Sequence, residues 1–115
     1  MAATAPPVRC VSSSLDGIFT LERAHHLFAE CAAASEGKSF ALLLDCRVME
    51  DYTPEAREAF TEWLSRERRR IDCVAIVTTR SLWHMVIATM SLVARLPMKP
   101  FSSPTTAAAW VASQR

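Results

Sequence analysis

Two short, uninterrupted apolar runs alternate with helical patterns along this chain, and this alternation constrains the fold more than any other feature. The first run is Phe40–Leu44 and the second is Cys73–Val77. A run of this length between two helical segments is typical of a strand that is covered on both faces of a sheet. Since helical crossovers join neighbouring parallel strands, we predict an α/β fold whose central strands are mainly parallel.

A helix precedes the first run. We predict it from residue 21 to about residue 34, with Thr20 as its N-cap and Gly37 just beyond its end. Upstream, residues 8–13 alternate loosely and predict an edge or second-layer strand, and Asp16-Gly17 predicts the turn between that strand and the helix.

The second helix has the strongest start signal. After a predicted loop from Asp45 to Tyr52, Thr53 is an N-cap and Pro54 occupies the first helical position. One apolar stripe is predicted to face the sheet, and it consists of Ala56, Ala59, Phe60, Trp63 and Leu64.

A third helix follows the second apolar run, with Ser81 as its predicted cap and Pro97 beyond its end. The residues predicted to face the sheet are Leu82, Val86, Met90, Val93 and Leu96. Trp83, Ile87 and Ala94 then lie on a neighbouring face, with Met85 and Met90 flanking it, and this additional apolar surface must be buried against something. The last helix, a dimer partner, an apolar ligand or a membrane surface would each bury this apolar surface. We expect Trp83, Ile87 and Met90 to contact a ligand or a partner.

The chain closes with a short strand at residues 98–101 and a helix that starts at Ser103-Pro104. Ala107, Trp110 and Val111 are predicted to point inward from that helix. The predicted order is therefore β-α-β-α-β-α-(β)-α.

Composition bounds the function. The 115 residues are half apolar and carry a formal net charge of +1, which suits one domain with its own core and argues against a nucleic-acid binder. The most apolar stretch, residues 82–96, is shorter than the ~20 residues that cross a bilayer. We expect a soluble, cytoplasmic, single domain at residues 8–115, after a flexible leader at residues 1–7 without the features of a secretory signal.

The cysteines give no metal or disulfide pattern. Cys10, Cys31, Cys46 and Cys73 are widely spaced without a CxxC pair, so we expect no metal, no cofactor and four reduced thiols in or near the core.

Several motifs in order resemble the SpoIIAA-like family, which includes STAS and SEC14-type domains. They are Gly17-Ile-Phe-Thr20-Leu-Glu, the strand that ends at Asp45, Tyr52-Thr53-Pro54-Glu55-Ala56-Arg57, the strand Cys73–Val77, and Phe101-Ser-Ser-Pro-Thr-Thr-Ala-Ala-Ala-Trp110. The resemblance covers roughly residues 15–111. It implies a small sheet, mostly parallel or mixed, with packed helices and no enzymatic activity.

The resemblance also implies two kinds of function. STAS members act as anti-sigma-factor antagonists and related switch proteins, in which a Ser or Thr at the start of the second helix is phosphorylated. SEC14-like members are associated with apolar ligands and membrane surfaces. Here Asp51-Tyr52-Thr53-Pro54 replaces the Asp-Ser-Ser-Gly type of switch loop, so Thr53 is the candidate phosphorylation site by position.

Other polar groups are weaker candidates. Asp45, Arg80 and Ser81 follow the central strands and mark a polar edge where open α/β sheets bind ligands. His25, His26 and Glu30 provide no complete metal site or catalytic triad.

Two hypotheses of function remain. The first is a non-catalytic regulatory module that binds a protein partner or its own copy, with Thr53 at the switch position. The second is a carrier of an apolar ligand, or a membrane-peripheral protein, that uses the apolar face of the third helix.

Overall fold

A computed structural model of the chain describes residues 9–114. Strand and helix alternate through the whole described part, which confirms the predicted order. The elements are β1 (Cys10–Phe19), α1 (Leu21–Ser35), β2 (Phe40–Tyr52), α2 (Pro54–Arg66), β3 (Ile71–Val77), α3 (Leu82–Ala94), β4 (Met98–Phe101) and α4 (Pro104–Ser113). The predicted leader at residues 1–7 lies outside the described residues.

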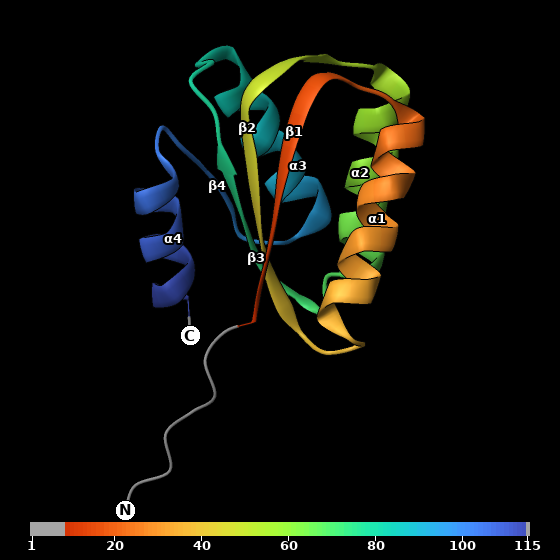
Figure 1. Cartoon of the computed structure of the whole chain (residues 1–115), viewed down its shortest axis with the longest axis vertical. Coiled ribbons are helices and arrows are strands. Elements are labelled where there is room, and N and C mark those ends of the chain that lie inside the picture. The colour runs from red at the N-terminus through yellow and green to blue at the C-terminus, as the bar shows by residue number, and fades with distance from the viewer. Residues whose placement is uncertain (1–8, 115) are drawn as a thin grey trace, which may run out of the picture.

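All the strands form one parallel sheet in the order β1-β2-β3-β4. Each new strand is added on the same side of the previous one. Right-handed crossovers between strands added in one direction place all their helices on one face of the sheet. The helices α1, α2 and α3 accordingly share one face, while α4, which follows the last strand, lies alone on the other face (Figure 1).

The sheet therefore separates two apolar cores. The larger core lies between the sheet and α1–α3 and includes Leu27, Leu64 and Ile87. The smaller core lies under α4, where Ala107 and Val111 contact the small side chains of β2 and β3. The inward residues predicted for α2 and α4 are confirmed in the main, although Ala59 and Trp110 are only partly buried.

The turn predicted at Asp16-Gly17 and the loop predicted from Asp45 to Tyr52 are both wrong. β1 and β2 continue as a parallel pair up to the Phe19–Tyr52 register. Gly17 has a φ of 58° and lies at a register shift, so it provides a bulge inside the strand, not a turn after it. Backbone pairing with β1 extends β2 beyond the apolar run that marks it in the sequence.

The face predicted for α3 is wrong in part: Met90 and Leu96 are buried as predicted, but Leu82 and Val93 are not. Leu82 is 82% exposed and Val93 is 61% exposed, whereas Ile87, Met90 and Ala94 are buried. Because α3 is apolar on almost every side, its hydrophobic periodicity does not predict which face is buried. Packing against the neighbouring α2 and β4 determines that face. The last helix does not cover the remainder of α3, since α4 lies across the sheet.

Three of the cysteines are buried, and Cys10 is exposed, contrary to the core position predicted for it. Cys10 points out of β1 on the side of the sheet that carries α4, and α4 lies over the other strands. Of the helices that the structure describes, none has both the length and the apolar character needed to cross a membrane.

Candidate functional site

An apolar pocket lies between the sheet, α2 and α3, close to the carboxyl ends of the strands. Its volume is about 60 Å³. Strands β1 to β3 and both helices line it, with Leu15, Phe19, Leu44, Cys46, Met49, Tyr52, Arg57, Phe60, Ile76, Trp83, Val86, Ile87 and Met90. In parallel α/β sheets this end is the usual place for a ligand, because the loops and helix starts gather there.

Local structure explains how these side chains converge. Leu44 and Cys46 lie two residues apart on β2 and so point to the same face of the sheet. Phe60 comes from the buried stripe of α2, and Ile87 and Met90 come from the buried stripe of α3. The extension of β2 to Tyr52 brings Met49 and Tyr52 into the lining as well.

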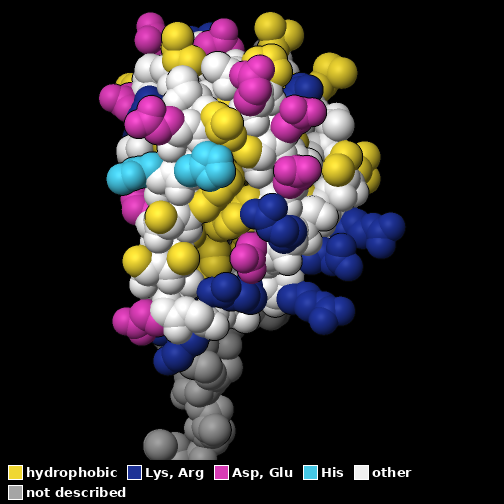
Figure 2. Space-filling view, turned by 90° about the vertical axis from the view of Figure 1, so that its right-hand side faces the viewer, with side chains coloured by type: hydrophobic (Ala, Val, Ile, Leu, Met, Phe, Trp, Pro, Cys, Tyr) yellow, Lys and Arg dark blue, Asp and Glu magenta, His cyan; other side chains and the backbone are white. Residues whose placement is uncertain are grey.

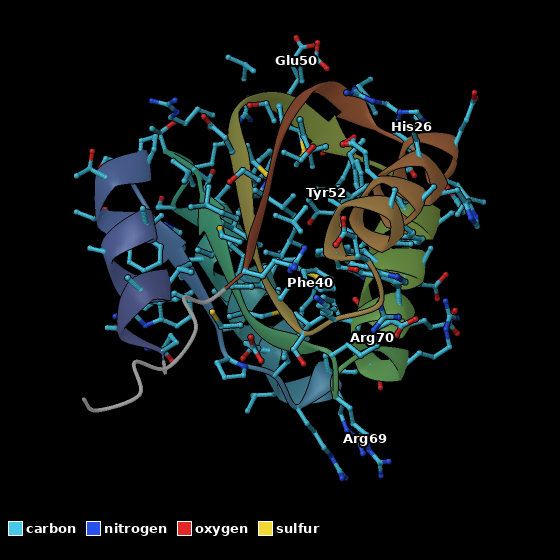
Figure 3. All side chains as sticks on the ribbon, turned by 60° about the horizontal axis from the view of Figure 1, so that its bottom comes forward. His26, Phe40, Glu50, Tyr52, Arg69 and Arg70 are labelled. Carbon is cyan, nitrogen blue, oxygen red and sulfur yellow. The ribbon has the colours of Figure 1, made fainter. Side chains whose placement is uncertain are left out.

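Aromatic side chains form one side of the pocket. The rings of Tyr52 and Trp83 meet edge to face with their centroids 5.9 Å apart. The guanidinium of Arg80 lies 5.0 Å from the centre of the Trp83 ring, within the range of a cation–π contact. Tyr52 lies between the sheet and the helices (Figure 3).

A second hollow continues from this pocket along the surface between α2 and α3. This interhelical groove has a volume of about 500 Å³ and shares Arg57, Val86 and Met90 with the pocket. Its other lining residues are Glu58, Thr61, Glu62, Met85, Thr89 and Val93. Pocket and groove therefore adjoin, and Arg57 lies where they meet.

The structure brings the residues of the predicted ligand face together, but it does not bring those of the predicted polar edge together. Trp83, Ile87 and Met90 come together in the pocket. Asp45 points to the opposite face of the sheet from its neighbours on β2, and Arg47 pairs with it at 2.7 Å. That hydrogen-bonded pairing holds the pKa of the Asp45 carboxyl below its usual value. Ser81 makes no side-chain bond that caps α3.

Thr53 lies beside the pocket at the start of α2. Its hydroxyl oxygen accepts a hydrogen bond from the Ala56 amide at 3.2 Å, which confirms its predicted role as an N-cap. Its own amide donates to the Phe19 carbonyl at 3.0 Å. Thr53 thus joins β1, β2 and α2 at the pocket end of the sheet.

Cys46 is the one lining residue with nucleophilic potential among those described, and its environment suppresses that potential. Burial, together with the nearby Asp45 charge, raises the pKa of the Cys46 thiol to about 12. The thiolate is therefore negligible near neutral pH, and Cys46 contributes apolar surface.

Other polar clusters stay apart from the pocket. His25 and His26 are exposed on α1, and the described residues hold no group of three or more side chains suited to a metal ion. Lys and Arg side chains gather in the lower half of Figure 2, and Arg69, shortly after the end of α2, points away from the protein in Figure 3.

Sequence reasoning missed several lining residues, above all Tyr52, Arg57 and Cys46. Tyr52 and Cys46 had been placed in a loop. In the sequence, Arg57 looks like any charged residue on the exposed face of a helix. Only the position of α3 in the structure shows that it borders a pocket.

Comparison with known proteins identifies the family. The family model described as SpoIIAA-like matches residues 11–112, which is nearly all of the described chain. This chain belongs to the SpoIIAA-like family. Members of the SpoIIAA-like family are generally non-catalytic regulatory or binding modules. No protein in the curated comparison matches the sequence.

A solved structure supports the SpoIIAA-like fold independently. It is the 2.25 Å crystal structure of an uncharacterised protein of the DUF3478 family, with a SpoIIAA-like fold, from Shewanella loihica PV-4. The TM-score is 0.72 at 16% sequence identity, and the match covers 87% of this chain and 82% of that one. At this identity the likeness concerns the fold.

Proposed function

We propose that this protein is a non-catalytic carrier that binds a small apolar molecule between α2, α3 and the sheet. The observation that carries the proposal is the pocket that Trp83, Ile87 and Met90 form with the ends of β1–β3. Each methylene group that moves from water into such a lining contributes about 0.8 kcal/mol to binding. A pocket without a positioned nucleophile or base fits binding better than chemistry.

The size of the pocket limits what it holds in this conformation. A volume of about 60 Å³ exceeds the ~10–15 Å³ that one water molecule needs, but it is smaller than the ~150 Å³ of a cavity that takes benzene. The pocket therefore admits the end of a chain, and the adjoining groove is available for the rest.

Native mass spectrometry of the protein purified from cells tests this function, with the denatured mass as reference. We expect a non-covalent mass excess that denaturation removes. Val86→Phe should abolish the excess, because Val86 borders both the pocket and the groove. Leu92→Phe is the matched control on the same helix, since Leu92 is 81% exposed and lines neither hollow. A wild-type protein without any excess mass, and without affinity for added alkanols, would contradict the proposal.

The outer face of α3 supports a second candidate function, which is association with a protein. This face consists of Leu82, Met85, Leu92 and Val93, and all of them are exposed. A patch of this kind on one helix is typical of an interaction surface. A phosphate on Thr53 would suit the positive end of the α2 dipole, so in this scheme it would act on the partner and not on the fold.

Light scattering after size exclusion tests the self-association form of this function. A dimer that dissociates in Leu92→Glu and in Thr53→Glu, but persists in Thr53→Ala, would support a switch of the STAS type. If Leu92→Glu leaves the mass of a dimer unchanged, the outer face of α3 is not the interface.

A further inference from the structure

Arg57 is the one charged side chain among the described residues that line the pocket. In the part of the chain that the structure describes, no carboxylate lies within ion-pair distance of its guanidinium, and unlike the other arginines without such a partner it lines the pocket. A guanidinium keeps its positive charge at every physiological pH and offers donors in a planar fork. Arg57 is thus a free cation at the border of an apolar site.

Other groups at this end of the pocket also favour an anion. Arg57 belongs to the first turn of α2, where the helix dipole is positive. The surface of the pocket itself is apolar, so an anion is favoured at its border and not inside it. Arg80, stacked on Trp83, adds a second positive charge nearby.

The groove limits where that anion can lie. Glu58 and Glu62 line the groove but not the pocket, so a negative charge further along the groove would meet two carboxylates. The favourable position is therefore at Arg57 itself. A head group with a single negative charge matches the single charge of the Arg57 guanidinium, which is, among the described residues, the one cationic side chain shared by pocket and groove.

The apolar part of the ligand has two directions open to it. The pocket lies on one side of Arg57, and the apolar side chains Met85 and Val93 line the groove on the other. A single flexible chain can lie along the groove, or place its first few carbons in the pocket, while its head stays at Arg57. A rigid, bulky molecule cannot enter a volume of about 60 Å³.

We propose that the ligand is a single-chain amphiphile with a carboxylate head, which Arg57 binds at the junction of pocket and groove. This inference rests on the proposed carrier function and adds the chemical class of the ligand. The Arg57 guanidinium donates two hydrogen bonds to the carboxylate, and the alkyl chain displaces water from the apolar lining.

Isothermal titration with three amphiphiles of equal chain length tests the head group. The probes are decanoate and decyltrimethylammonium, used below their micelle concentrations, and decanol, used below its solubility limit. We expect decanoate to bind about tenfold or more tightly than decanol, since hydrogen bonds to charged groups are the stronger kind. Decyltrimethylammonium should bind more weakly than decanol.

Arg57→Gln should remove the preference for decanoate, and it should weaken decanoate far more than decanol, because decanol carries no charge for the guanidinium to bind. Arg57→Lys should keep part of the preference, because the charge remains while the fork is lost. Arg66→Gln is the matched control, since Arg66 is exposed on the same helix and lines neither hollow. Circular dichroism of each variant verifies the fold.

The outcomes separate this inference from the function on which it rests. If decanol and decanoate bind wild-type protein equally well, or if the cationic probe binds most tightly, the carboxylate assignment is overturned and the carrier function stands. If Arg57→Gln weakens decanol as much as decanoate, the role of Arg57 is apolar contact and the assignment is again overturned. If none of the probes binds, the carrier function itself fails.

Discussion

Thr53 connects three elements at the pocket end of the molecule. Its amide bonds to β1, it follows the last residue of β2, and its hydroxyl caps α2. Ser81 has the corresponding position before α3, but its backbone is helical and its side chain makes no cap bond. The sequence predicts both hydroxyl residues as N-caps, but only Thr53 caps its helix in the structure.

The difference predicts unequal effects on stability. Thr53→Ala should lower the free energy of unfolding by about 1 kcal/mol, because the Ala56 amide loses its acceptor. Ser81→Ala should change it by less than about 0.5 kcal/mol. Urea denaturation of both variants measures this, and equal losses would mean that Ser81 caps α3 in solution.

At the scale of elements, α3 determines the site. It has no Asp, Glu, Lys or Arg between Leu82 and Ala94. Buried and exposed positions are therefore both apolar, and the hydrophobic pattern does not distinguish them. Packing against α2 and β4 places Ile87 in the core and leaves Leu82 outside.

Paired truncations on α3 test this assignment. Ile87→Ala should cost about 2–5 kcal/mol, as expected when a buried aliphatic side chain is removed from a packed core. Leu82→Ala should change the stability by less than about 0.5 kcal/mol, since Leu82 is 82% exposed. Thermal or urea unfolding gives both values. A larger loss for Leu82→Ala would restore the face predicted from the sequence.

At the scale of the whole molecule, the position of α4 decides what remains available for binding. Because α4 lies across the sheet, it fills the smaller core with Ala107 and Val111. The face formed by α1–α3 has no further helix in the described chain, so α2 and α3 flank the interhelical groove without a cover. This arrangement leaves the outer face of α3 exposed as well.

The local signals in the sequence were sufficient for the order of elements. Thr20, Thr53 and Ser103 are caps in the structure, and the runs Phe40–Leu44 and Cys73–Val77 lie in central strands. Caps and buried runs depend on neighbours in sequence, and for this reason they can be read without tertiary information. Trp83, Ile87 and Met90 line one pocket, and their role as a ligand or partner face stays a prediction.

Long-range pairing determined the rest. The extension of β2 to Tyr52 depends on hydrogen bonds to β1, and those partners lie more than thirty residues apart in the chain. The position of Arg57 at a pocket depends on α3, which the sequence places far away. The sequence by itself determined the alternation of strands and helices, because each element carries its own periodicity and caps. Only the tertiary structure decided which face of α3 is inside and where the pocket lies, because those choices depend on contacts between distant segments.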